Sequence, residues 1–167
     1  MVPFNKSNSL IICGHWLSQD EKQNDPWAES IKERAKILYF ASKLEWFNQY
    51  WCDKEKSNWQ KLHYINNIFT WAYVFEIHFD VRWEKSNQGT KILYAWQTSE
   101  KEILNWEKNL SFANEISQNL DWKIVNSWGL NLLNSSKKPT VIMEVWDPQL
   151  PNFEETQKKV LDFLNNL

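Results

Sequence analysis

Apolar residues occupy every second position of the segment 69–83, from Phe69 to Trp83. This spacing has a period of two, and side chains on a β-strand alternate between the two faces of a sheet. The pattern predicts one long strand with an aromatic and β-branched face. Its polar face carries Glu76, His78, Asp80 and Arg82. Because such a strand is longer than usual, we expect a bend, a bulge or a protrusion beyond the sheet.

The remaining elements follow from local signals. Four further strands are expected from short apolar or alternating runs bounded by turn residues: 9–13, 91–97, 122–128 and 140–146. Three helices are expected from apolar residues at helical spacing after N-cap signals: 26–51, 99–120 and 152–164. The segment 59–67 is ambiguous between a short helix and irregular chain, and 131–138 is expected to be a polar loop. The strands 69–83 and 91–97 should form an antiparallel hairpin.

The element order is therefore β-α-β-β-α-β-β-α. It predicts an α+β fold, with helices packed on one face of a mainly antiparallel sheet. The first six elements match the ferredoxin-like order, which hosts many unrelated functions, RNA recognition among them. With 167 residues and no internal linker, the chain is expected to form a single domain over residues 1–167.

Charge and cysteine content narrow the classes of protein. The formal net charge is -2, and basic residues are interleaved with acidic ones, so we expect no strong electrostatic footprint for nucleic acid or membrane. The apolar run near the N-terminus is too short for a signal peptide or a membrane span. Cys13 and Cys52 lack any ligand spacing and are expected to be buried thiols. A cytoplasmic location follows as an expectation.

Nucleotide and cofactor motifs are missing. The three glycines, Gly14, Gly89 and Gly129, are not clustered, so the chain contains neither a P-loop nor a dinucleotide fingerprint. The neighbours Cys13 and His15 have no third residue beside them in the sequence to orient the imidazole. We therefore expect no cofactor and no metal site.

The strongest acid–base candidates lie on the polar face of the long strand. Glu76, His78, Asp80 and Arg82 should point the same way, about 7 Å apart. Two carboxylates beside an imidazole can bind a divalent metal or transfer protons. The alternative is a solvated sheet face with alternating charges, which half-exposed strands often carry, and we favour it.

Tryptophan is unusually frequent, with twelve residues spread along the chain. Indole carries a polar N–H and is enriched where protein interfaces concentrate their binding energy. The alternative is an aromatic core. For an interface we select four residues, namely Val81 and Trp83 at the end of the long strand, Trp59 and Trp146. An open strand edge at 81–91 could pair with a partner's strand.

A weaker set could contact single-stranded nucleic acid by combining basic and stacking side chains. Its members are Lys54, Lys56, Lys61, His63 and Tyr64. Asp53 and Glu55 interrupt the basic character, so a solvated connection explains the segment equally well.

Three functions remain after these exclusions. The leading hypothesis is a non-catalytic protein–protein interaction module, an accessory subunit of a larger prokaryotic assembly. The first alternative is an RNA-handling accessory in a ribonucleoprotein complex, such as a CRISPR-type antiviral defence effector, with weak or indirect RNA contact. The second alternative is a small metal-dependent hydrolase using the strand face of Glu76, His78 and Asp80. The balance favours a protein that is not an enzyme and that binds other subunits.

Overall fold

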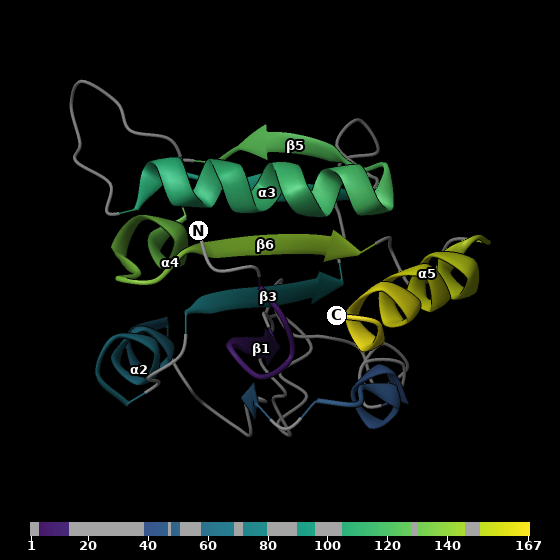
Figure 1. Cartoon of the computed structure of the whole chain (residues 1–167), viewed down its shortest axis with the longest axis horizontal. Helices are drawn as coiled ribbons and strands as arrows, with labels where there is room; N and C mark the ends of the chain where they lie inside the picture. Colours follow the sequence, from purple (N-terminus) through teal and green to yellow (C-terminus); the bar gives the residue numbers. More distant parts are fainter. Residues whose placement is uncertain are drawn as a thin grey trace, which may run out of the picture.

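Six strands form one sheet in the order β2-β1-β3-β6-β4-β5. The computed structural model describes residues 4–13, 39–46, 48–50, 58–68, 72–79, 90–95, 105–127, 130–145 and 151–167. The strands are β1 Ser9–Cys13, β2 Gln49–Tyr50, β3 Tyr73–Phe79, β4 Lys91–Tyr94, β5 Lys123–Asn126 and β6 Thr140–Val145. They lie side by side across the middle of the molecule (Figure 1).

Most neighbouring strands run parallel. β1 is parallel to both β2 and β3, β3 is parallel to β6, and β4 is parallel to β5. Only the β4–β6 pair is antiparallel among the described strands. The chain is a mixed helix-and-strand fold as expected, but the predicted mainly antiparallel sheet is wrong and the ferredoxin-like arrangement is not confirmed.

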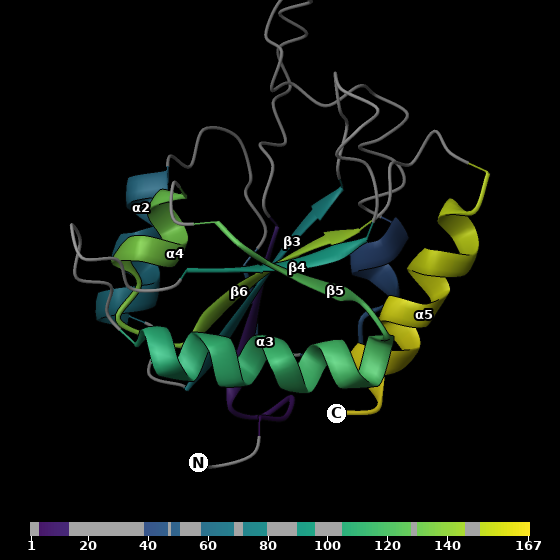
Figure 2. The same ribbon diagram turned by 90° about the horizontal axis from the view of Figure 1, so that it is seen from above.

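Helices cover both faces of this sheet, whereas the sequence predicted one covered face. α3 Trp106–Leu120 and α5 Phe153–Asn165 pack on one side. α2 Asn58–His63, its π-helical continuation η1 Tyr64–Ile68, and the short α4 Asn131–Ser135 lie on the other (Figure 2). Residues 39–43 are also helical. None of the described helices combines the length and the apolar character needed to cross a membrane.

The central strands are buried on both faces, which explains the parallel arrangement. Tyr73, Phe75 and Ile77 of β3 pack with α3 and α5. Val74, between them, packs on the opposite face with Ile65 of η1. Strands that are apolar on both sides are typical of parallel sheets covered by helices on each face. The solvated polar face expected for β3 is therefore wrong.

Several local predictions are confirmed. β1 and β6 occupy the segments predicted for strands, β5 lies within 122–128, and α5 begins just after Asn152. Asn152 makes no side-chain capping bond, however. The ambiguous segment 59–67 is helical.

Other local predictions are wrong. β4 pairs with β6 and β5, so the predicted hairpin between 69–83 and 91–97 does not form. Residues 131–135 form α4 where a loop was expected, and residues 49–50 form a strand inside the predicted first helix. The expectation of one domain over residues 1–167 stays a prediction, because the described ranges do not cover the whole chain.

Candidate functional site

His78 and Glu144 lie beside each other at the carboxyl ends of two neighbouring parallel strands. His78 is the next-to-last residue of β3, Glu144 is the next-to-last residue of β6, and the two are register partners. Register partners in parallel strands point to the same face. In sheets covered by helices, ligands bind beyond the carboxyl ends of the strands. This pair therefore marks the end of the sheet where a ligand is expected.

A buried ion pair between Lys61 and Glu76 lies next to His78. Lys61 of α2 donates a hydrogen bond from its Nζ to Oε1 of Glu76 over 2.9 Å. The other carboxylate oxygen, Oε2, lies 3.3 Å from Nε2 of His78. The side chains of Lys61 and Glu76 are only 1% and 4% exposed, whereas that of His78 is 21% exposed. His78 is thus the member of this group that solvent reaches.

The charges of the group shift its pKa values in opposite directions. Burial by itself raises the pKa of Glu76, but the charges and hydrogen bonds of His78 and Lys61 outweigh it and lower the pKa to about 2. Burial lowers the pKa of His78, but the carboxylates of Glu76 and Glu144 outweigh both burial and the charge of Lys61. The pKa of His78 is therefore raised from 6.5. Glu76 is a carboxylate at neutral pH, and the imidazole readily holds a proton.

Glu144 is the fourth ionisable residue of the site, after Lys61, Glu76 and His78, and it is buried, with 7% exposure. Across from it on the antiparallel neighbour β4 lies Lys91, its register partner on the same face. A buried carboxylate is costly unless charges or hydrogen bonds compensate for it. His78 on one side of Glu144 and Lys91 on the other are placed where their charges can compensate for the carboxylate.

The structure brings together only part of the sequence-predicted sites. Glu76 and His78 belong to the group above. Lys61 was assigned to nucleic acid, but its ammonium group is buried against Glu76, so it offers no exposed basic contact. Several predicted residues lie outside the described residues: Asp80, Arg82, Val81, Trp83, Trp146, Lys54 and Lys56. His15, Cys52 and the side chain of Cys13 also lie outside them.

Trp59, proposed for an interface, is 70% exposed on α2. Its ring stacks on His63 with the centroids 5.4 Å apart and the planes at 18°. Tyr64 follows at the start of η1 and is partly buried. The rings of Trp59 and His63 thus cover each other on one side. A contact of Trp59, His63 or Tyr64 with a partner stays a prediction.

Sequence reasoning missed Glu144. The signal was present in the sequence, because Glu144 is the one charged residue of β6 and lies between the apolar residues Met143 and Val145. A charge within a strand that is buried on both faces is rare unless it is paired or functional. Its partner, however, is set by the parallel register of β3 and β6, which the sequence does not reveal.

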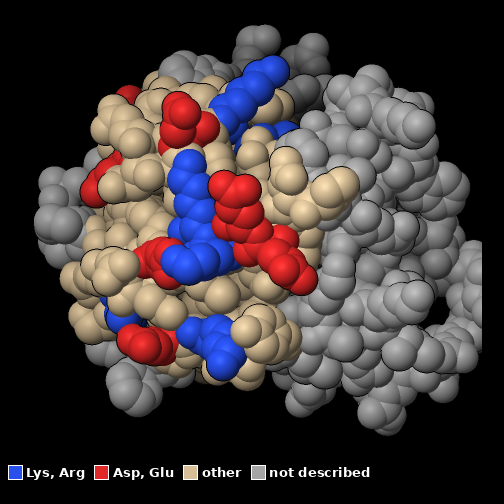
Figure 3. Space-filling view, turned by 90° about the vertical axis from the view of Figure 1, so that its right-hand side faces the viewer, with Lys and Arg blue, Asp and Glu red and all other residues tan. Residues whose placement is uncertain are grey.

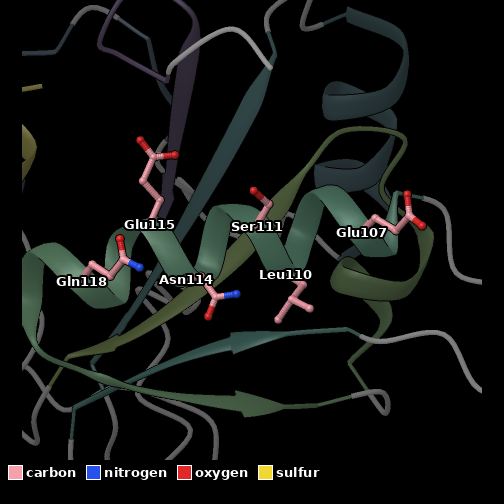
Figure 4. A pocket seen from close by; sticks show the side chains of 6 residues that line it. All are labelled: Glu107, Leu110, Ser111, Asn114, Glu115 and Gln118. Carbon is pink, nitrogen blue, oxygen red and sulfur yellow. The ribbon is translucent and has the colours of Figure 1, made fainter.

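Two hollows elsewhere do not assemble comparable chemistry. One, of about 490 Å³, runs along the outer side of α3 between Glu107 and Gln118. Its lining side chains leave the helix in several directions and do not converge on one point (Figure 4). The other, of about 740 Å³, lies between residues 39–43 and α5, where Lys158 and Asp162 pair with each other.

Charge on the side where β3 and β6 end is mixed. Figure 3 shows acidic and basic side chains next to one another over the described part of this face. The first turn of α5, for example, carries Glu154 and Glu155, and Lys158 follows on the same helix. A phosphate backbone favours a surface of predominantly positive charge. The described part of this face does not offer one.

Three solved amidases share this fold. An N-acetylmuramoyl-L-alanine amidase from Clostridium difficile 630 superposes with a TM-score of 0.64 at 15% identity, covering 95% of this chain and 92% of that one. The amidase Ami1 from Mycobacterium smegmatis gives 0.64 at 12% identity, covering 94% and 92%. The CwlD amidase from Clostridioides difficile, solved in complex with the GerS lipoprotein, gives 0.55 at 17% identity, covering 95% and 94%. No family model and no curated protein matches the chain.

These likenesses establish the fold, and they contradict the functional interpretation drawn from the sequence. The matching structures are catalytic proteins, so a non-catalytic accessory subunit is not supported. The assignment to antiviral defence and RNA handling fails for the same reason. The surplus of tryptophan misled the sequence analysis, because Trp46 and Trp122 are core residues with 5% and 6% exposure.

Proposed function

We propose that the chain is an amide hydrolase of the N-acetylmuramoyl-L-alanine amidase type, with His78 and Glu144 at its catalytic centre. The observation that carries the proposal is their register pairing at the carboxyl ends of β3 and β6. It is supported by the shared fold, since all three compared structures are amidases that match over more than nine-tenths of this chain. The substrate would be the amide that joins the muramoyl lactyl group to L-alanine in peptidoglycan.

Glu144 suits the role of general base. Its carboxylate is buried beside an imidazole, where it can take a proton from a water molecule as that water attacks the amide carbon. When the C–N bond breaks, the same proton passes to the leaving amine. General acid–base catalysis of this kind contributes about 10²–10⁴-fold to a rate.

His78 suits the role of stabilising the oxyanion that forms next to Glu144. Its pKa is raised by Glu76 and Glu144, so the ring can take up a second proton on the nitrogen that does not face Glu76. That N–H can stabilise the negative charge that develops on the carbonyl oxygen. It is the member of the group that solvent reaches, so a substrate can reach it as well.

The donor chemistry also fits a divalent cation, because imidazole and carboxylate are both ligands of Zn²⁺. His78 would be a ligand of the ion, and Glu144 would lie beside it. When bound, it supplies a Lewis acid that polarises the carbonyl and acidifies a water molecule. The described residues contain no group of three or more His, Cys, Asp or Glu that could hold a metal. His15, two positions beyond the end of β1 in the sequence, lies outside them.

The test is hydrolysis of purified peptidoglycan, with new alanine N-termini measured by amine labelling. We expect release by the wild type and a loss of about 10²-fold or more in Glu144→Gln and His78→Ala. Glu107→Gln on the outside of α3 and His63→Ala on α2 are matched controls and should keep full activity. Release of reducing sugar without new amines, or no release by folded protein, would contradict the proposal.

The metal is tested in the same preparation. Metal content is measured on the protein as purified, and activity is measured after dialysis against a chelator and after return of Zn²⁺, Mn²⁺ or Mg²⁺. A His15→Ala variant shows whether a second histidine contributes to metal retention. Activity that survives complete metal removal would assign the oxyanion role to protein groups alone.

A protein partner remains part of the proposal, supported by the CwlD amidase having been solved with the GerS lipoprotein. Affinity purification from the native host followed by mass spectrometry tests it. The cytoplasmic location stays a prediction, and cell fractionation tests it. A peptidoglycan substrate makes that measurement informative, since peptidoglycan lies outside the cytoplasmic membrane.

A further inference from the structure

Lys61 is an unusual residue for the interior. Its side chain is 1% exposed and lies next to a cluster in which Leu62 of the same helix packs with Ile65 and Val74. A fully buried lysine is rare and needs a partner, which Glu76 provides. Replacing a buried ion pair by apolar residues is often neutral or stabilising, so stability alone does not account for the pair.

The two oxygens of the Glu76 carboxylate contact two different neighbours. Oε1 accepts the hydrogen bond from Lys61, and Oε2 faces Nε2 of His78. An ionised carboxylate is only an acceptor, so it favours the tautomer in which the ring nitrogen that faces it carries the hydrogen. In the neutral ring, Nδ1 then carries no hydrogen and is the nitrogen that can take up a proton or bind a ligand. A carboxylate behind a histidine fixes the tautomer and the ring orientation in many catalytic and metal sites.

We propose that Lys61 and Glu76 are positioning residues that hold His78 with its proton on Nε2, so that Nδ1 is the nitrogen that acts on the substrate. Lys61 sets the orientation of the carboxylate, and Glu76 sets the orientation of the imidazole. The inference depends on the proposed function only in taking His78 as the reacting imidazole. It adds two residues, from α2 and β3, to a site otherwise formed by the ends of β3 and β6.

The direct measurement is the tautomer of His78, read by long-range ¹H–¹⁵N correlation on protein with ¹⁵N-labelled histidine. The chain has only three histidines, His15, His63 and His78, so assignment needs only single substitutions. At a pH where the ring is neutral, we expect Nε2 at the shift of a protonated nitrogen and Nδ1 at that of an unprotonated one. A wild-type ring protonated on Nδ1 would overturn the proposal without any activity assay.

The matched variant removes both charges together. Lys61→Met/Glu76→Leu leaves neither charge of the pair behind in the interior, so the protein should fold. In it, the two ring nitrogens should move toward the averaged shifts of a mixed tautomer. Carboxylates that orient a histidine in this way contribute about 10–100-fold to activity, so we expect kcat to fall by a factor in that range, with little change in KM. Lys158→Gln/Asp162→Asn, which removes the exposed pair of α5, is the control and should change neither reading.

The two proposals fail in different ways. If the double variant keeps the wild-type tautomer and kcat, the positioning role is wrong while the amidase activity stands. If the wild type has the expected tautomer but releases no alanine amines from peptidoglycan, the amidase function is wrong while the positioning of His78 stands.

Discussion

The Lys61–Glu76 pair allows a sharp test of how this fold tolerates charge in its interior. Each single substitution removes one partner and leaves the other charge buried. Lys61→Met leaves the Glu76 carboxylate without its ammonium, and Glu76→Leu leaves the Lys61 ammonium without that carboxylate. Breaking a buried pair in this way typically destabilises a protein by about 3–5 kcal/mol. For a chain of this size that corresponds to a decrease of roughly 10 °C in Tm.

The double variant separates the two effects. Lys61→Met/Glu76→Leu removes both charges and refills the volume with apolar groups, so its stability should lie within about 1 kcal/mol of the wild type or above it. The assay is urea unfolding followed by circular dichroism, on metal-free protein, for all four members of the cycle. The Lys158→Gln/Asp162→Asn cycle on α5 is the exposed control and should show coupling of about 0.5 kcal/mol or less. Additive losses at Lys61 and Glu76 would refute a coupled buried pair.

The same cycle carries a pH signature. The pKa of Glu76 is about 2 in the folded chain, against 4.5 for an unperturbed glutamate. Its contribution to stability is therefore fully present above pH 4.5 and is lost as the pH falls toward 2. That shift corresponds to about 3 kcal/mol. The pKa of His78 is raised, so its contribution is present below 6.5 and is lost as the pH rises through the raised value. The free energy of unfolding of the wild type should therefore be highest between pH 4.5 and 6.5. In the double variant, it should fall less as the pH decreases from 4.5 toward 2.

The remaining predictions concern the scaffold and are all read as free energies of unfolding. Trp46→Phe removes the indole N–H that donates to the Leu164 carbonyl over 2.8 Å in the interior, and we expect a loss of about 1–3 kcal/mol. Asn109→Ala frees the backbone N–H of Thr140, which donates to Asn109 Oδ1 over 2.9 Å, with a loss of similar size, about 1–3 kcal/mol. Phe75→Ala opens a cavity in the centre of β3 and should cost about 3–5 kcal/mol. A loss below about 0.5 kcal/mol in any of the three would contradict the packing described for that residue.

Elements with a strong local signal were predictable. The strand at 9–13 is a short apolar run ended by a glycine, and the helix after Asn152 shows the 3.6-residue spacing of Phe153, Val160 and Leu164. These signals depend only on neighbours along the chain, so tertiary context does not change them. Residues 131–135 show the opposite case. Leu132 and Leu133 pack against two different clusters under the sheet, and that packing stabilises a helix that the polar composition did not predict.

The direction of the strands was not predictable from the pattern in the segment 69–83. Alternation fits a strand with one solvated face, and it led to an antiparallel hairpin with 91–97. In the structure, β3 lies between β1 and β6, and α2 covers its second face, where the polar residue Glu76 meets Lys61. A buried polar position that is satisfied by a distant lysine is indistinguishable, in sequence alone, from an exposed one.

Only part of the candidate site could be predicted from the sequence. Glu76 and His78 are two residues apart, so strand geometry alone placed them on one face. Glu144 is far from both in sequence and meets His78 only because β6 pairs with β3 in parallel, in one particular register. A shift of one residue in that register would turn the register partner of His78 from Glu144 to an apolar neighbour, Met143 or Val145, which faces the other side of the sheet. The apolar residues that flank Glu144 are buried against α3 and α5, so moving them to the other face would expose the core cluster. Hydrophobic burial on one face of β6 therefore fixes the placement of the carboxylate on the other.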